Sequence, residues 1–227
     1  APIGIEYRID LLGAFVLVTV SAIGAIVIVF ARASVAREIP SDRIYLFYVM
    51  YLLCFTGLLG IAVTGDAFNL FVFLEIASLS SYVLISLGRD RRALTASFRY
   101  LIMGTIGATF YIIGVGLMYM MTGTLNMADL PQRVAMLDVT DRPLFEAGAA
   151  LLGIAFLVKA GVWPLNFWLP TAYAAASAPV AAIFAVLTAL VIGRTERAQG
   201  QVEEYHARLA MRAGDALGNV PLIHSYV

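Results

Sequence analysis

Long apolar segments are the feature that most limits how this chain can fold. A helix that crosses a bilayer needs about 20 mostly apolar residues, and Leu11–Ala31 supplies such a run without a charged side chain. Backbone amides in lipid have no water to bond with, so segments of this kind are expected to be helical. The sequence predicts an all-α fold, a polytopic transmembrane helical bundle of about six spans. These are Leu11–Ala31, Ile44–Thr64, Ala67–Leu87, Leu94–Met121, Glu146–Trp163 and Ala174–Ile192.

The composition excludes several classes of protein. Of the 227 residues, 61% are hydrophobic and 13% are charged, whereas about 25% of a typical soluble domain is charged. A soluble globular enzyme, a disordered chain and a nucleic-acid-binding protein do not fit this balance. The formal net charge is +0, which provides no general attraction to polyanions. We therefore expect the lipid bilayer to be the partner of this surface, and no nucleic acid.

Arginines in the connecting segments predict the orientation of the bundle. The Arg32–Arg43 connection and the Arg89–Arg99 region lie on the same side of the membrane and together hold seven arginines. Positively charged loops remain in the cytoplasm. This side is therefore expected to be cytoplasmic, and the amino end of the chain to face outward.

The composition changes abruptly after Ile192, which divides the chain into two expected domains. Residues 1–193 form the transmembrane bundle, and residues 194–227 carry charges together with apolar residues at helical spacing. The second segment is predicted to be a soluble, amphipathic carboxy-terminal helix that does not cross the membrane.

Glu75 is the first candidate for chemistry. It lies about eight residues into its predicted span, roughly 12 Å along the helix, where a charge costs at least a few kcal/mol. One interpretation is a protonated carboxyl that hydrogen-bonds to a neighbouring helix. The other is a proton carrier, or the partner of a buried cation, with Ser78, Ser81 and Tyr82 close enough to line a polar face.

Lys159 is the second candidate, because it is the single lysine in a chain with fourteen arginines and it lies inside an apolar run. Arginine does not release its proton in proteins, whereas a buried lysine can titrate. Lys159 could serve as a fixed counter-ion for Glu75, as a side chain that reaches the interface, or as a member of a proton relay. Together the two residues form a possible acid–base pair whose coupled titration would suit a pump or antiporter.

Pro164 and Gly161 predict a break in the helix that carries Lys159. Proline cannot accommodate the bond to residue i−4 and would free the carbonyl of Ala160, although a simple kink is the alternative. Broken helices beside charged residues are typical of ion sites in transporters. Trp163 and Trp168 fit equally well as anchors at the membrane interface.

No motif for catalysis or for a cofactor is present in the sequence. There is no Walker motif, no nucleotide fingerprint and no Ser-His-Asp set, and His206 and His224 in the tail do not suggest a metal site. We expect no cofactor, no metal, and no enzymatic activity of this chain alone.

Three segments resemble the antiporter-like membrane subunits shared by respiratory complex I and the multisubunit Mrp sodium/proton antiporters. Thr64–Leu87 resembles the family helix with the essential glutamate, at Glu75, and Arg99–Gln132 resembles the helix and loop that follow. Phe156–Tyr173, FLVKAGVWPLNFWLPTAY, resembles the broken helix with the central lysine, at Lys159. The resemblance covers about residues 1–188 and fits the Mrp D-type subunit best.

The resemblance implies a proton- or monovalent-cation-translocating subunit of a bacterial inner membrane. Partners would be other membrane subunits of an antiporter or of an NADH-quinone oxidoreductase-like complex. Family members contain two inverted repeats, and the match implies only the first. With Ala1 in place of a methionine, the chain is expected to be a fragment or a processed product.

The tail resembles a different protein. Residues 195–227 are similar to the intracellular helical extension of an ABC exporter of the cyclic glucan type. The alternative functions are therefore an ABC-exporter-like transmembrane segment, or a chimeric membrane fragment without transport activity.

Overall fold

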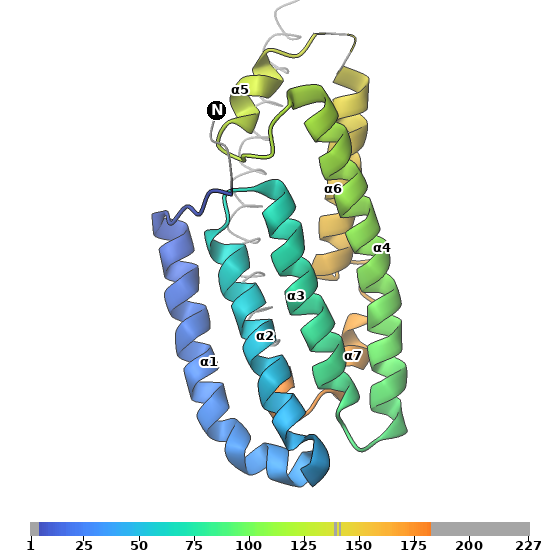
Figure 1. Ribbon diagram of the computed structural model, residues 1–227. Helices are drawn as coiled ribbons and strands as arrows, with labels where there is room; N and C mark the ends of the chain where they lie inside the picture. The colour runs from blue at the N-terminus through green and yellow to red at the C-terminus, as the bar shows by residue number, and fades with distance from the viewer. Residues whose placement is uncertain (1–4, 139, 141, 183–227) are drawn as a thin grey trace, which may run out of the picture. The chain divides into compact units, whose positions relative to one another are not determined.

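The computed structural model describes residues 5–138, 140 and 142–182, and this part of the chain is helical (Figure 1). Two isolated bridges, Tyr7 to Thr64 and Asp66 to Asn126, are the only extended pairings within it. Five of its helices are long and apolar enough to cross a membrane. The all-α, polytopic fold predicted from the sequence is confirmed for this region. The elements are α1 (Leu11–Glu38), η1 (Ser41–Arg43), α2 (Ile44–Val63), α3 (Ala67–Ser86), α4 (Arg91–Thr122), α5 (Leu130–Ala135), α6 (Arg142–Ala160) and α7 (Leu169–Ala175).

Consecutive long helices run antiparallel and pack beside one another in chain order. α1 packs on α2, α2 on α3 and α3 on α4, while α6 packs along α4 and α7 lies against the amino-terminal half of α4 (Figure 1). The connection from α2 to α3 is only three residues long. Such short connections force neighbouring spans to be antiparallel.

Aspartates fix where three of the spans begin. The Asp66 carboxylate accepts a hydrogen bond of 2.8 Å from the Asn69 amide, and Asp10 and Asp90 accept equivalent bonds at the starts of α1 and α4. A side-chain cap of this kind satisfies an amide that the helix itself leaves free.

Close backbone approach between α4 and α6 depends on glycine. A Cβ atom placed on Gly114 would lie 2.8 Å from the carbonyl oxygen of Gly148, and one on Gly148 would lie 3.0 Å from the carbonyl oxygen of Gly114. Both distances are shorter than an ordinary van der Waals contact. Small residues at such crossings are how membrane helices pack tightly without a hydrophobic driving force.

The first helix is longer than predicted. The sequence suggested that the polar connection begins at Arg32, but α1 continues to Glu38. Charged side chains near a helix end extend into the headgroup region, where water satisfies them, so they need not end the helix. The boundaries of α2 and α3 lie within one residue of the predicted spans.

The sixth predicted span begins differently from the prediction. Ala174 and Ala175 belong to the short helix α7, the backbone is extended at Ala176, and helix resumes at residues 178–182. Pro179 therefore lies at the start of a helix, where it is tolerated, and not inside one. The remainder of Ala174–Ile192 and the predicted soluble helix at 194–227 lie outside the described residues.

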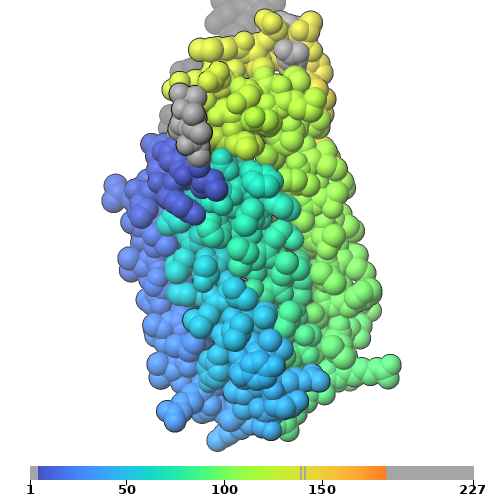
Figure 2. Space-filling model, viewed as in Figure 1, coloured from blue at the N-terminus to red at the C-terminus, as the bar shows by residue number. Residues whose placement is uncertain are grey.

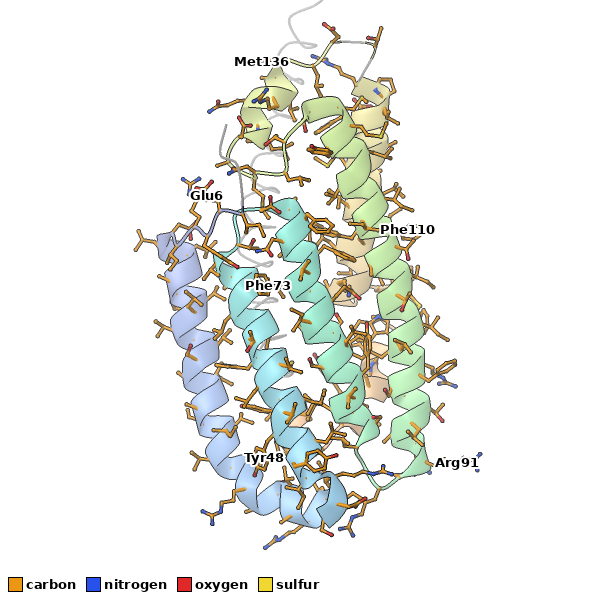
Figure 3. All side chains as sticks on the ribbon, in the orientation of Figure 1. Glu6, Tyr48, Phe73, Arg91, Phe110 and Met136 are labelled. Atoms are coloured by element: carbon orange, nitrogen blue, oxygen red, sulfur yellow. The ribbon has the colours of Figure 1, made fainter. Side chains whose placement is uncertain are left out.

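The outer surface of the helices, which would face lipid, is apolar, as a membrane protein requires. Many large apolar side chains of α1, α2 and α4 are exposed, including Val18, Ile26 and Val29 of α1. Figure 2 shows the face that α1, α2, α3 and α4 form together. Exposed arginines occur at the end of the bundle where α1 finishes and α4 starts, in agreement with the two arginine-rich connections (Figure 3).

Cysteine labelling in intact cells tests the orientation. We predict that cysteines placed at Arg37 and Arg91 are protected from an impermeant thiol reagent, whereas one at Asp138 reacts, because the arginine-rich end should be cytoplasmic. All three positions are exposed. Cys54 is buried and is best replaced by alanine beforehand. Equal reaction at Arg91 and Asp138 contradicts the orientation.

Candidate functional site

An ion pair joins α3 and α6 in the interior of the bundle. The Lys159 Nζ lies 3.1 Å from the Glu75 Oε1, and the two side chains are only 15% and 25% exposed. They are 84 residues apart in sequence. Each charge offsets part of the desolvation penalty that the other would suffer alone at this depth. The juxtaposition that the proposed acid–base pair requires is therefore present.

One face of α3 carries a short row of polar side chains, which begins with Glu75 of the ion pair. Glu75, Ser78 and Tyr82 are spaced by three and four residues, which places them on the same side of the helix. Lys159 Nζ donates a second hydrogen bond, of 2.9 Å, to the Ser78 Oγ. The ammonium group is thus held between a carboxylate and a hydroxyl, and both acceptors come from α3.

The end of α6 places Lys159 in its final turn. Gly161 has a φ of 62°, in the left-handed region. Its amide donates to the Val158 carbonyl at 3.2 Å, and the Val162 amide donates to the Leu157 carbonyl at 3.1 Å. These two bonds form a Schellman motif, the usual way for a helix to end at glycine. The carboxy-terminal end of the helix dipole also favours a positive charge at Lys159.

The break that Gly161 and Pro164 predict is present, but it starts before the proline. The helix α6 already ends at Ala160, so Pro164 does not lie inside a kinked helix, the alternative left open by the sequence. Residues 163–168 form turns, and helix resumes at Leu169. Gly161 therefore supplies the left-handed residue at the break, and Pro164 lies within the turns that follow.

Three aromatic rings form a stack beside the ion pair. The rings of Tyr100 and Trp168 stack with centroids 4.4 Å apart, and Tyr82 meets Tyr100 edge to face at 4.5 Å. The Tyr82 hydroxyl lies directly over Gly104 and occupies the space that a Cβ atom at this position would need. Trp168 is 4% exposed. The stack connects α3, α4 and the segment after α6, and so fixes that segment close to Lys159.

The tryptophans occupy different environments. Trp163 is 81% exposed, and its role as an interface anchor stays a prediction, whereas Trp168 is buried against Tyr100 and is not an anchor. Sequence reasoning missed Tyr100 as a member of this site. An aromatic residue in an apolar helix carries no signal that identifies its partner.

Metal ligation receives no support from the described part of the chain. Among residues 5–138, 140 and 142–182, no group of three or more His, Cys, Asp or Glu side chains is arranged to hold a metal ion. The chemistry available at the site is that of its acid and its amine.

Comparison with known proteins identifies the family of the chain. Residues 64–195 match the family described as NADH:quinone oxidoreductase/Mrp antiporter, transmembrane. The chain belongs to this family. The matched region contains both Glu75 and Lys159, so the family resemblance found in the sequence is confirmed where the ion pair lies.

Two curated relatives and one solved structure extend the match toward the amino terminus. The D-type subunit of a probable K(+)/H(+) antiporter from Rhizobium meliloti is 45% identical over 189 residues, which are 83% of this chain and 34% of that protein. The N-type subunit of NADH-quinone oxidoreductase from Desulforudis audaxviator is 43% identical, with 82% and 36% covered. A chain of the membrane-bound sulfane sulfur reductase, an archaeal respiratory membrane complex, superposes with a TM-score of 0.71 at 37% identity, with 79% and 36% covered.

These matches establish a multi-pass membrane protein of the antiporter-subunit family. The chain spans about a third of the length of the curated relatives it matches. What the names of these relatives state about transport or redox chemistry applies to them.

A double-mutant cycle tests whether the two charges are coupled. We predict that Glu75→Gln and Lys159→Met each destabilise the bundle, because each leaves one charge without its partner. The double variant should lose less free energy of unfolding than the two single variants lose together, with a coupling free energy of about 0.5–3 kcal/mol. Reversible unfolding in mixed detergent micelles measures the four free energies of unfolding. Glu146→Gln, at an exposed glutamate of α6, is the matched control and should change little.

Proposed function

We propose that this chain is part of a membrane subunit that translocates protons or monovalent cations, and that Glu75 and Lys159 form its proton relay. The observation that carries the proposal is the 3.1 Å contact between a lysine amine and a glutamate carboxylate inside a membrane bundle. Family membership supports the transport role. The name of the Rhizobium meliloti relative includes exchange of potassium for protons.

The relay works by changing the separation of the two charges. In contact, the ammonium and the carboxylate stabilise each other's charged forms. When the contact breaks, each group is left charged in an apolar setting, so the amine tends to release a proton and the carboxylate tends to bind one. Repeated separation and contact would therefore move protons through the site, provided that access to each side of the membrane alternates.

The proposal depends on the positively charged side chain being a lysine and not an arginine. A guanidinium keeps its proton under all relevant conditions, so arginine could hold Glu75 but could not exchange a proton. The chain uses arginine at fourteen positions and lysine only here. The Ser78 hydroxyl, which already contacts the amine, provides a second site from which a proton can move along α3.

The setting we propose is a multisubunit complex in a bacterial inner membrane. The structural relative belongs to a respiratory membrane complex, and a relative is named as a subunit of NADH-quinone oxidoreductase. In such an assembly this chain would supply ion transport, and other subunits would carry any redox reaction. We therefore assign it the role of a transport subunit without catalytic residues or a cofactor of its own.

Proton flux distinguishes a relay from a structural ion pair. We predict that Lys159→Arg inserts and folds normally but reduces proton flux in proteoliposomes by roughly tenfold or more, the scale of a lost proton-transfer group. Lys159→Ala and Glu75→Gln should also lose flux. A pH-sensitive dye measures it, with the full chain reconstituted together with its partner subunits.

The proton flux of Lys159→Arg decides whether the ion pair is a proton relay or a structural contact. Flux in Lys159→Arg close to that of the unaltered protein would show that the pair is structural only. Glu146→Gln serves as the control, because it alters an exposed carboxyl on the same helix without touching the pair.

We further propose that residues 194–227 form a domain separate from the bundle, in keeping with the change of composition after Ile192. The similarity of this segment to an ABC exporter extension, which would make it foreign to the antiporter-like part, belongs to the same proposal. All of these residues lie outside the described part of the chain.

Deletion of residues 195–227 tests the separation. We predict that the shortened chain inserts into the membrane and keeps the helical circular dichroism and melting temperature of the bundle, because a separate domain adds nothing to the stability of α1–α7. Loss of folded protein upon deletion would contradict a separate tail.

A further inference from the structure

A cavity at the arginine-rich end of the bundle is not used by the ion pair. It lies between the start of α4 and α7 and has a volume of about 600 Å³. Its walls include three arginines, two threonines and one aspartate, with alanines between them. The lining residues that matter here are Arg91, Arg92, Thr95, Arg99, Thr171 and Asp90.

Positive charge dominates this cavity. The Asp90 carboxylate is already engaged, because it caps α4 through the Arg92 amide at 3.0 Å and lies 3.9 Å from the Arg92 Nε. Arg91 and Arg99 have no carboxylate within salt-bridge distance in the described part of the chain. Within that part of the chain their guanidinium groups are available to an anion, and guanidinium matches phosphate with paired hydrogen bonds.

Arg91 and Arg99 lie in one row on α4, at a depth where lipid headgroups can reach them. Arg91, Thr95 and Arg99 are four residues apart, so they follow one another along one side of the helix, over about 12 Å. With 32 residues, α4 is about 48 Å long, which exceeds the roughly 30 Å of bilayer hydrocarbon. The first turns of α4 can therefore lie among lipid headgroups. Figure 3 places Arg91 at this end of the helix.

An apolar row runs beside the basic one. Leu94, Phe98 and Ile102 are also four residues apart and are all exposed. This row is adjacent to the row of Arg91 and Thr95 around the helix. A ligand held here would meet basic groups with its head and apolar side chains with the rest of its length, a combination that suits a phospholipid and not a free anion.

We propose that the cavity between α4 and α7 binds the phosphate headgroup of an anionic phospholipid, with its acyl chains along Leu94, Phe98 and Ile102. The shared chemistry of the ligand is a phosphate, and inorganic phosphate is the other source of it. Basic pockets between helices on the cytoplasmic side are suited to acidic lipid headgroups. The site lies at the end of the bundle for which the arginines predict a cytoplasmic location.

Spin-labelled lipids in reconstituted membranes test the site. The full chain is placed in phosphatidylcholine vesicles, and electron paramagnetic resonance compares how strongly it immobilises spin-labelled phosphatidylglycerol and spin-labelled phosphatidylcholine. We expect selection of phosphatidylglycerol, which weakens as salt screens the charges. Arg91→Gln with Arg99→Gln should reduce the relative association constant by roughly 25-fold, since each basic residue near the surface contributes about fivefold.

A control variant separates lipid selection by this cavity from lipid selection by the other arginines at the same end of the bundle. Arg32→Gln with Arg37→Gln removes two exposed arginines of α1 that do not line the cavity, and selectivity should persist. An equal loss in both double variants, or no loss in the first, overturns the proposal. Should the first variant fail to reconstitute, Arg99→Gln alone should reduce the relative association constant by about fivefold, and no reduction overturns the proposal. Loss of bound phosphatidylglycerol upon addition of inorganic phosphate at matched ionic strength would assign the site to free phosphate and overturn the lipid.

Discussion

The contact between Lys159 and Glu75 is the interaction on which the interior of this bundle depends. Neither charge can remain alone at that depth without a penalty of several kcal/mol, and their 3.1 Å contact gives each a partner. The contact also ties α3 to the end of α6, two elements that are far apart in the chain. A break in this one contact changes both the protonation preferences of the two groups and the link between two helices.

The surrounding packing allows the pair to form. Glycines at the crossing of α4 and α6 let the backbones approach, which carries Lys159 past α4 toward α3. Gly161 follows directly after the last residue of α6, and the stack of Tyr100 on Trp168 holds the next segment in place. The tight packing thus supplies geometry, while the polar row on α3 supplies the acceptors for the amine.

The sequence predicted the spans well, because apolar length is a local property. The ends of α2 and α3 agree within one residue, whereas α1 extended into its charged connection, since charges near a helix end are compatible with helix. Glu75 and Lys159 stood out as charges in apolar runs. Their contact could not be derived, because composition and periodicity carry no information on which helix faces meet across 84 residues. The same limit hid Tyr100 and the burial of Trp168.

Infrared difference spectroscopy of the reconstituted protein tests the central claim most directly. The claim is that Glu75 gains and loses a proton when an imposed pH gradient drives transport, in step with its contact to Lys159. The account predicts a protonated-carboxyl band that changes with the gradient and disappears in Glu75→Gln but persists in Glu146→Gln. A gradient-dependent spectrum that is the same with and without Glu75 would contradict the relay.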